Sequence, residues 1–422
     1  MRAGIVVTGT EVLTGRVSDR NGPWIADRLL GLGVDVGRVV VVGDRPADLL
    51  AALGQLADDH DLLVTTGGLG PTADDLTAAV VAEHQGRAMV LDEALRSRIT
   101  AIVDGVVAQR RHRPDPAALA AGTHKQAMVP DGAVVLAPVG TAPGLVVTPA
   151  PGRDGVPIVV LPGPPGELRG MWPDALAAAP VRAVLERASP LTQRTIRMWG
   201  SWEAELAVTL ERIADRIEGL EVTTCLRDGE LEVVTRYRPE SADQYPTLQA
   251  AIETDFAATV FSVDGGSVDE VVAGALIDRG WRIATAESCT GGLLAGRLTA
   301  RPGSSAYVAG GLVVYANEAK TTLAGVPAEL ITTHGAVSRE VAEALAAGAR
   351  AALGTELGVG ITGIAGPDGG TRDKPVGTVH VAVSSPTGCR HRELHLPGDR
   401  DAVRQRTVVV ALHEVRLLLT RS

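Results

Sequence analysis

Aromatic residues and cysteines are scarce in this sequence. Phe, Trp and Tyr together make up 3% of the 422 residues, so we expect hydrophobic cores built from Val, Leu, Ile and Ala, with glycines allowing helices to pack closely on sheets. Cysteine occurs only at Cys225, Cys289 and Cys389, which are far apart in the chain. This usage excludes a disulfide framework and a Cys-x-x-Cys metal site, and it favours a reducing, cytoplasmic location.

Positive charge is also in deficit, since the formal net charge is -10 and no long basic run occurs. A general nucleic-acid binder needs a positive face that releases counterions from phosphate, so we expect no direct nucleic-acid partner. No apolar segment is long enough to cross a bilayer without interruption by Gly, Pro or charge. The first residues show no signal-peptide cleavage site, and we expect a soluble protein with no membrane partner.

The order of hydrophobic patterns predicts the fold class. A chain of this length is too long for one core. Strand and helix patterns alternate over residues 1–172 and again over 268–422, which is typical of parallel sheets covered by helices. Residues 173–262 alternate like an antiparallel sheet, with a hairpin turn at Asp228-Gly229. We therefore expect an α/β protein with two three-layer α/β domains, joined by a small α+β module.

The stretch "ATAESCTGGLLAGRLT" places Ser288 between a predicted strand and a predicted helix over 290–299. Thr290, Gly291 and Gly292 would form the first helical turn, whose exposed N–H groups can stabilise an oxyanion or bind phosphate. Two alternatives stay open. Ser288 can serve only as a helix cap, and Cys289 can be either a nucleophile or a buried inert thiol.

Two further segments carry candidate groups for the same site. "VVYANEAKTTLAGV" puts Tyr315 at a strand end and Lys320 in the first turn of the next helix, where the helix dipole and desolvation would lower the lysine pKa. Such a lysine can act as base to a serine, although a solvated helix lysine is the common case. "GITGIAGPDGG" predicts a Gly-rich anion-binding loop after Thr362, with counter-charge from Lys374 and Arg404.

Together with "GAVSREVAEALAAGAR", these segments make residues 268–420 resemble the C-terminal domain of the competence/damage-inducible protein CinA family. The resemblance implies an amidohydrolase that converts nicotinamide mononucleotide (NMN) to nicotinate mononucleotide and ammonia without a cofactor. It implies Ser288 as nucleophile, Lys320 as base, and Tyr315 and Thr362 in the catalytic site. It also implies substrate binding by Arg404, preferred to Arg400, and by the glycines Gly291, Gly292 and Gly366.

The N-terminal region suggests a different chemistry. "VVTGTEVLTG" puts Glu11 just after the first strand, and "TTGGLGPTADDLT" puts Gly67, Gly68 and Gly70 after a later one. Thr72, Asp74 and Asp75 would then stand at a helix start. Free N–H groups beside carboxylates fit a site where a divalent cation bridges Asp and pyrophosphate oxygens. The alternative is that Thr72 and the aspartates only cap the helix.

With "KQAMVPDG", "VGTAPGL" and "LPGPPGEL", residues 1–172 resemble the MoaB/MogA-like molybdopterin-binding domain at the front of full-length CinA proteins. The resemblance implies metal-dependent hydrolysis of ADP-ribose to AMP and ribose 5-phosphate, and a homodimer. It places substrate contacts at Gly67, Gly68, Gly70, Lys125 and Gly144, and a divalent metal of unknown identity near Asp74, Asp75 and Glu11. Thr123-His124 and Ala137-Pro138 depart from the family, whose members tend to carry asparagines there.

Three readings of the whole chain remain at this point. Both domains can act on fragments of NAD, or the pyrophosphatase alone operates beside a vestigial C-terminal site. The third reading is a nucleotide- or pterin-binding protein that assists competence or DNA-damage responses. Retention of the Ser288, Tyr315, Lys320 and Thr362 set favours an active amidohydrolase.

Overall fold

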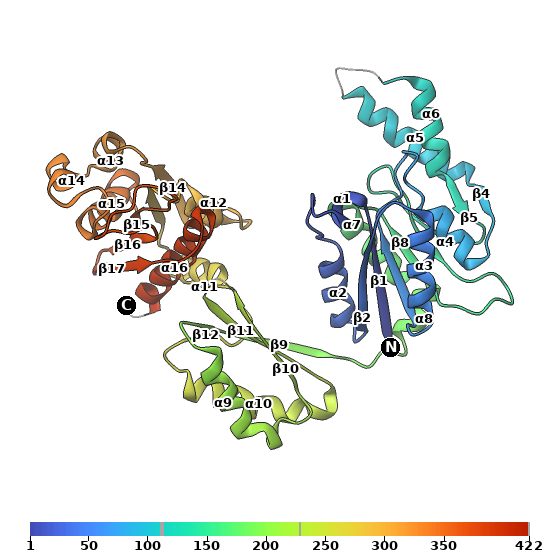
Figure 1. Cartoon of the computed structure of the whole chain (residues 1–422), viewed down its shortest axis with the longest axis horizontal. Coiled ribbons are helices and arrows are strands. Elements are labelled where there is room, and N and C mark those ends of the chain that lie inside the picture. The colour runs from blue at the N-terminus through green and yellow to red at the C-terminus, as the bar shows by residue number, and fades with distance from the viewer. Residues whose placement is uncertain (110–113, 228, 421–422) are drawn as a thin grey trace. The chain divides into compact units, whose positions relative to one another are not determined.

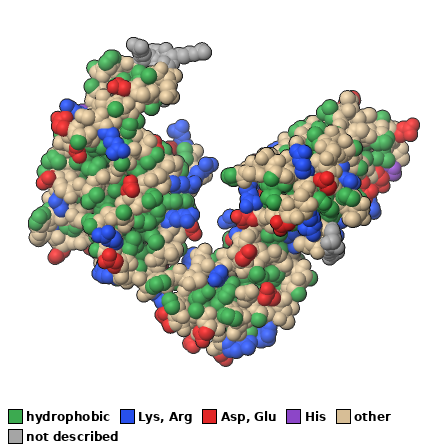
Figure 2. All heavy atoms as spheres, turned by 180° about the vertical axis from the view of Figure 1, so that it is seen from behind, with side chains coloured by type: hydrophobic (Ala, Val, Ile, Leu, Met, Phe, Trp, Pro, Cys, Tyr) green, Lys and Arg blue, Asp and Glu red, His purple; other side chains and the backbone are tan. Residues whose placement is uncertain are grey.

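The structure is a computed structural model that describes residues 1–109, 114–227 and 229–420. Its contacts divide the chain into two compact units, Met1–Thr192 and Gln193–Ser422 (Figure 1). Acidic and basic side chains are interspersed on the face of each unit shown in Figure 2. No helix in the described part of the chain has the length and apolar character needed to cross a membrane.

The first unit contains a six-stranded sheet in the order β2-β1-β3-β8-β7-β6. β2, β1, β3 and β8 are parallel, while β7 and β6 join antiparallel. The strands are β1 (Arg2–Thr8), β2 (Asp35–Val42), β3 (Leu62–Thr66), β6 (Val134–Leu136), β7 (Gly144–Val147) and β8 (Ile158–Leu161). A separate antiparallel pair consists of β4 (Met89–Leu91) and β5 (Met128–Pro130).

Helices cover both faces of this sheet, because each buried strand is apolar on both sides. In β1, Ile5 and Val7 face one core and Val6 faces the other. The helices of the unit are α1 (Thr10–Leu13), α2 (Gly22–Gly31), α3 (Pro46–Ala57), α4 (Thr77–Gln85), α5 (Glu93–Ala108), α6 (Pro116–Gln126), α7 (Pro165–Ala177) and α8 (Ala179–Leu185). α2, α7 and α8 pack in the first core, and α3, α4 and α5 in the second. This is the predicted three-layer α/β architecture.

The predicted domain boundary after residue 172 is wrong. It falls inside α7, and the first compact unit continues to Thr192. The physical reason is burial: Trp172 and Ala175 of α7, and Val181 and Val184 of α8, belong to the same core as β1 and β3.

The middle module is a four-stranded sheet in the order β10-β11-β9-β12. Its elements are β9 (Thr192–Trp199), α9 (Glu203–Ile213), the 3-10 helix Ala214–Arg216, β10 (Glu221–Arg227), β11 (Glu230–Tyr237), the 3-10 helix Pro239–Gln244, α10 (Tyr245–Asp255) and β12 (Val260–Ser262). β10 and β11 are antiparallel, with Arg227 opposite Glu230, as the predicted hairpin requires. Asp228 itself lies outside the described residues. The predicted small α+β module is confirmed.

The C-terminal domain has a five-stranded sheet in the order β14-β13-β15-β16-β17. β14, β13 and β15 are parallel, and β16 and β17 join antiparallel. The strands are β13 (Ile283–Glu287), β14 (Val308–Val313), β15 (Leu357–Gly363), β16 (Thr378–Ser385) and β17 (Gly388–His395). The helices are α11 (Val268–Arg279), α12 (Leu293–Thr299), the 3-10 helix Ser304–Ala306, α13 (Asn317–Ala324), α14 (Ala328–His334), α15 (Arg339–Leu353) and α16 (Arg400–Thr420).

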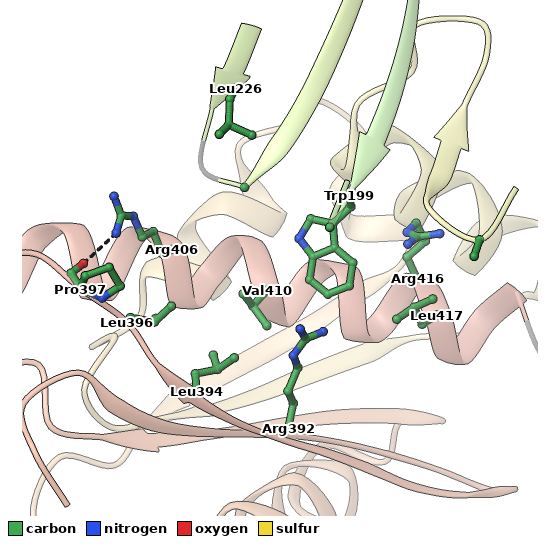
Figure 3. A pocket seen from close by; sticks show the side chains of 13 residues that line it. Trp199, Leu226, Arg392, Leu394, Leu396, Pro397, Arg406, Val410, Arg416 and Leu417 are labelled. Carbon is green, nitrogen blue, oxygen red and sulfur yellow. Dashed lines mark hydrogen bonds between the residues drawn. The ribbon is translucent and has the colours of Figure 1, made fainter. Parts of the chain in front are cut away.

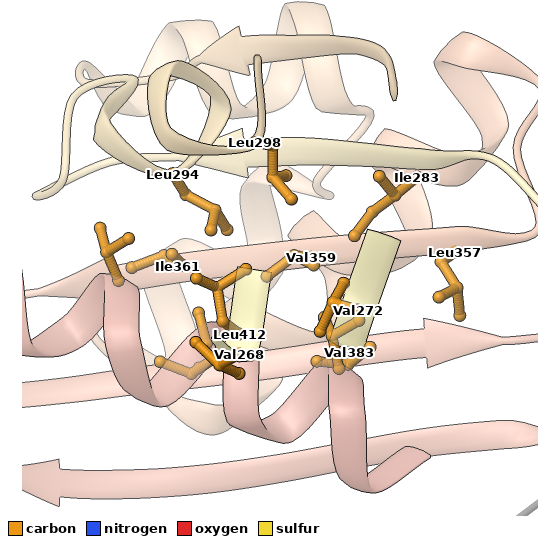
Figure 4. Close-up of a cluster of buried hydrophobic side chains, with 14 of the residues drawn as sticks. Val268, Val272, Ile283, Leu294, Leu298, Leu357, Val359, Ile361, Val383 and Leu412 are labelled. Atoms are coloured by element: carbon orange, nitrogen blue, oxygen red, sulfur yellow. The ribbon is translucent and has the colours of Figure 1, made fainter. Parts of the chain in front are cut away.

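Two cores flank this sheet as well. Val272 of α11, Leu294 of α12 and Leu412 of α16 pack on Val359 and neighbouring strand residues (Figure 4). The opposite face packs against α13 and α15. Close helix-on-sheet packing is visible at Gly360 of β15, where a Cβ atom would overlap the carbonyl oxygen of Ala342 in α15. The predicted role of glycine in close packing is confirmed there.

Candidate functional site

Ser288 lies directly after β13, at the carboxyl end of a parallel strand. It is 8% exposed. Its N–H donates to the carbonyl oxygen of Ile361 in β15 at 2.9 Å, and its own carbonyl accepts the N–H of Gly291 at 3.1 Å. Gly291 and Gly292 have φ values of 62° and 94°, in the left-handed region that favours glycine. The two glycines therefore shape the turn that carries Ser288.

The helix cap at this turn is Glu287, and the prediction that Ser288 serves only as a cap is wrong. Helix α12 begins at Leu293, three residues later than predicted. The buried Glu287 carboxylate accepts the N–H groups of Gly292 at 3.1 Å, Leu294 at 3.0 Å and Ala295 at 2.8 Å, and the Thr285 hydroxyl at 3.1 Å. A carboxylate at the positive end of a helix stabilises it, so the Ser288 hydroxyl is left for another purpose.

The same contacts overturn one expectation about the glycines. The N–H groups of Gly291 and Gly292 were expected to be open to an oxyanion or a phosphate. They already donate to Ser288 and Glu287 within the turn. Oxyanion stabilisation at Ser288 must therefore use other donors.

Lys320 is buried beside this turn, so the prediction of an ordinary solvated lysine is wrong. It lies in α13 and is 2% exposed. Its Nζ donates to the carbonyl oxygen of Tyr315 at 3.0 Å. Burial lowers the lysine pKa, and the weaker influences of Cys289 and Glu318 act in the opposite direction. Among the described contacts Nζ has no direct hydrogen bond to Ser288 Oγ, a bond that often tightens only when substrate is bound.

Cys289 favours the inert alternative. It is 6% exposed, and burial raises the pKa of its thiol to about 11. Because the thiolate is the nucleophilic form, a thiol that stays protonated near neutral pH is a poor nucleophile. Of the two neighbouring candidates, Ser288 is the stronger.

Both candidate arginines lie in the first turns of α16 and tie separate segments together. Arg404 donates from Nε to the carbonyl of Cys289 at 3.2 Å and from Nη2 to that of Thr290 at 3.1 Å. Arg400 donates from Nη1 to the carbonyl of Gly366 at 2.7 Å and from Nη2 to the Tyr315 hydroxyl at 3.1 Å. The structure thus brings Tyr315, Gly366 and the Ser288 turn to the start of one helix.

Thr362 lies near the end of β15. It is buried, and its hydroxyl donates to the carbonyl of Ala336 at 2.6 Å. Lys374 donates to the carbonyls of His334 and Val337 at 3.0 and 2.6 Å, so its ammonium fixes the segment before α15. This contact replaces the free counter-charge that was expected of Lys374.

The N-terminal candidates line a cavity of about 390 Å³ at the carboxyl ends of β1, β3 and β8. Of the predicted residues it contains Glu11, Gly67, Gly68, Gly70, Asp74 and Asp75. Sequence reasoning missed several other lining residues, namely Thr8, Asp44, Gln126, Thr141 and Glu167. Burial raises the pKa of the Glu167 carboxyl, which is typical of an acid in a recess.

The aspartates precede α4 and do not cap it, so both the predicted helix start and the capping alternative are wrong. Helix α4 begins at Thr77 without a side-chain cap. Asp75 instead accepts the Thr72 N–H at 2.9 Å and the Thr72 hydroxyl, and Lys125 donates to the Thr72 carbonyl. A hydrogen bond from Thr72 lowers the pKa of Asp74. These contacts hold the loop together at the cavity.

Gly144 is not among the residues that line this cavity, unlike the predicted glycine contacts Gly67, Gly68 and Gly70. It begins β7, and a Cβ atom there would lie 3.0 Å from Leu136 and 3.1 Å from Met171. Its glycine is explained by core packing, and the preceding residues Thr141 and Ala142 line the cavity instead.

Within residues 1–109, 114–227 and 229–420, no group of three or more His, Cys, Asp or Glu side chains is arranged to hold a metal ion. Glu11, Asp74 and Asp75 nevertheless line one cavity. A magnesium-like cation is commonly held by one or two carboxylates together with substrate phosphates, and the residues fit that mode.

Asn21 and Gln126 also hold the N-terminal loops, and neither was identified from the sequence. Asn21 donates to the Thr66 hydroxyl at 2.9 Å and to the Gly163 carbonyl at 2.7 Å. Gln126 donates to the Leu69 carbonyl at 3.1 Å, within the Gly-rich loop. The available signals were the Asn21-Gly22-Pro23 start of α2 and the segment "KQAMVPDG", in which Gln126 directly follows the candidate Lys125.

Two family models match the chain. One, described as CinA C-terminal domain, matches residues 266–419, and the other, described as Probable molybdopterin binding domain, matches residues 4–180. The CinA-like protein of Mycolicibacterium gilvum (strain PYR-GCK) is 54% identical over 424 aligned residues, covering 99% of both chains. The CinA-like protein of Mycobacterium tuberculosis (strain ATCC 25177 / H37Ra) is 52% identical over 427, covering 99% of this chain and 97% of its own.

Among solved structures, the competence/damage inducible protein CihA from Agrobacterium tumefaciens is 41% identical, with a TM-score of 0.35. It covers 38% of this chain and 99% of its own length. The two family models and the relatives that match over full length agree with the resemblance seen in the sequence. The chain belongs to the CinA family.

Proposed function

We propose that the C-terminal domain hydrolyses the carboxamide of NMN to give nicotinate mononucleotide and ammonia. The observation that carries this proposal is a strand-end serine beside a buried lysine whose pKa is lowered by burial. Glu287 caps α12, which leaves the Ser288 hydroxyl available as a nucleophile. Membership of the CinA family is consistent with this proposal.

In the proposed mechanism, uncharged Lys320 accepts the Ser288 proton while Ser288 Oγ attacks the carboxamide carbon. Lys320 then protonates the departing nitrogen, and ammonia leaves an ester on Ser288. Water hydrolyses the ester, with Lys320 taking its proton and returning it to Oγ. The carbonyl of Tyr315 can keep one Nζ hydrogen bond throughout, which holds the amine in place.

Negative charge on the substrate and on the oxyanion requires cationic or N–H partners. A guanidinium has five N–H donors. Arg404 and Arg400 use only part of this capacity to hold the turn and the 362–370 loop. In this proposal their remaining donors bind the phosphate and the product carboxylate. Which of Arg404 and Arg400 binds which group depends on how far each guanidinium extends toward the substrate.

The test is ammonia release from NMN by the purified full-length protein without added metal. Wild type and Cys289→Ala should be active and Ser288→Ala inactive, while thermal unfolding shows that all three are folded. An active Ser288→Ala would exclude the assigned nucleophile, and loss of activity in Cys289→Ala alone would transfer that role to the thiol. No release by folded wild type would reject the amidohydrolase.

The N-terminal cavity supports a second candidate function, hydrolysis of ADP-ribose with a divalent cation. Its support is the Gly-rich loop at Gly67, Gly68 and Gly70 beside Glu11 and Asp75 in one recess. A bound cation would supply charge neutralisation at the pyrophosphate oxygens. The Gly67 N–H already donates to the Leu161 carbonyl, so in this proposal phosphate is received by other N–H groups of the loop. Thr72 orients the Asp75 carboxylate. Formation of AMP from ADP-ribose by wild type with added magnesium, and its loss in Asp75→Asn, would support this function. No AMP formation by folded wild type would refute it.

A further inference from the structure

The middle module is held against the C-terminal domain through α16. The Trp199 indole, at the end of β9, stacks on His413 of α16 with ring centroids 4.3 Å apart and an interplanar angle of 6°. His413 Nε2 lies 2.7 Å from Glu230 Oε1, and the Phe261 ring packs edge-on at 4.9 Å. His413 is fully buried, so this contact fixes the joint between the two parts.

A cavity of about 730 Å³ lies at this joint, within the range of about 300–1,000 Å³ common for small-molecule sites. The middle module contributes five lining residues, Trp199, Gly200, Leu226, Gly229 and Ala258. Figure 3 shows Trp199 reaching toward α16, with Arg392, Leu394 and Leu396 on the far side of the recess. The C-terminal domain completes the lining with Pro397, Arg406, Val410, Arg416 and Leu417.

The lining combines apolar surface with guanidinium groups. Arg392, Arg406 and Arg416 contribute three cations, and the described lining contains no carboxylate. The carboxylates that contact the same cluster are Glu414 and Glu230. Glu414 is bound by Arg390 and Arg392, and Glu230 is bonded to His413. Among the lining residues that the structure describes, positive charge therefore exceeds negative charge.

These guanidiniums are already oriented, and each retains donors. Arg406 Nη1 donates to the Pro397 carbonyl at 2.7 Å, and Arg416 Nε donates to His413 Nδ1 at 3.2 Å. Arg392 Nη1 donates to Glu414 at 3.1 Å, and its guanidinium lies 4.8 Å from the Trp199 ring centre. Fixed cations lose little freedom when an anion binds, which favours affinity.

We propose that this cavity binds a small organic anion with an apolar body. The arginines receive the anionic group, and Trp199, Leu394, Leu396 and Val410 contact the rest. The ligand contacts both the middle module and α16, and it lies apart from the Ser288 turn, which α16 reaches through Arg404. The site is separate from the sites of both proposed activities, so the binding proposal can be tested independently of them.

The test uses the full-length protein and 8-anilinonaphthalene-1-sulfonate, an aromatic sulfonate whose emission rises in apolar surroundings. Wild type should bind one equivalent saturably, and added salt should weaken binding. Arg406→Gln should weaken it about tenfold or more, as loss of a charged partner does, and Val410→Phe should block it by filling the recess. Arg301→Gln removes an exposed arginine of the same domain outside the lining and serves as the matched control.

Uncharged N-phenyl-1-naphthylamine separates anion recognition from simple apolar binding. It should bind about tenfold or more weakly than the sulfonate. Equal binding of the two probes, or equal binding by wild type, Arg406→Gln and Val410→Phe, would overturn the proposal. Absence of saturable binding to folded wild type would do the same. Thermal unfolding of each variant ensures that lost binding is not lost folding.

Discussion

Replacing Lys320 by methionine should stabilise the protein while abolishing its proposed amidase activity. Lys320 is 2% exposed, and its ammonium has one described hydrogen bond, to the Tyr315 carbonyl. Methionine is unbranched and similar in length, so it can fill the same space. The substitution therefore removes a buried titratable group without opening a large cavity.

The magnitude follows from two opposing contributions. Desolvating an ammonium in a protein interior costs several kcal/mol, even after relaxation. Its hydrogen bond to Tyr315 returns about 1.5–3 kcal/mol, because the donor is charged. We expect Lys320→Met to raise the free energy of unfolding by about 1–3 kcal/mol. For a unit of this size, each kcal/mol corresponds to a Tm increase of roughly 2–4 °C.

The effect has a defined dependence on pH. The folded-state pKa of Lys320 lies below the ordinary lysine value of 10.5 because of burial. Below the lowered pKa both folded and unfolded lysine are protonated, and the full burial cost is present. As pH rises from there toward 10.5, the folded state loses the proton first, so wild-type stability rises. The advantage of Lys320→Met should therefore be larger near neutral pH than near pH 10.

Urea unfolding near pH 7 and near pH 10 measures the stability difference, and ammonia release from NMN measures activity. Loss of a general base should lower kcat by about 10²–10⁴-fold. Lys374→Met is the matched control, since it removes another lysine of the same domain that is bonded to backbone carbonyls. A variant less stable than wild type at neutral pH would refute the burial argument, and one retaining most activity would refute the base.

Three further outcomes are expected. Glu287→Gln should lower the free energy of unfolding by about 2–4 kcal/mol in urea, because an amide NH₂ would face N–H groups that the carboxylate accepts. Iodoacetamide near pH 8 should label the two exposed cysteines but not Cys289, as counted by mass spectrometry; labelling of all three would contradict its burial. Burial lowers the His413 pKa, so the Trp199 joint should lose stability as pH falls below 6.5, seen as a tryptophan fluorescence change.

The alternation of strand and helix patterns predicted both α/β domains, because strands buried on two faces appear as continuous apolar runs. The boundary at 172 was missed for a physical reason. Pro173 follows immediately and suggests an interruption, yet it lies inside α7. Only the three-dimensional core shows that Trp172 and Val184 pack together with β1.

At the C-terminal site, the residue types were predicted better than their contacts. Ser288, Tyr315, Lys320 and Gly366 do gather, since each follows or lies near a strand end of one sheet. The sequence could not show that Glu287 takes the N–H groups of α12. That depends on the direction of a side chain at the last strand residue, where alternation no longer distinguishes core from solvent. Arg400 was the less preferred of the two candidate arginines, and the sequence could not show that its two contacts connect Tyr315 to Gly366.

The choice of cation at position 320 is itself informative. The chain has only three lysines among its 40 Lys and Arg residues, so arginine is its usual basic residue. Arginine would stay protonated at this buried position, because its guanidinium does not lose a proton in proteins. Lysine can become neutral when burial lowers its pKa, as it does here. A purely structural cation would gain from the extra donors of arginine. A general base must be able to exist uncharged, which lysine at position 320 allows and arginine would not.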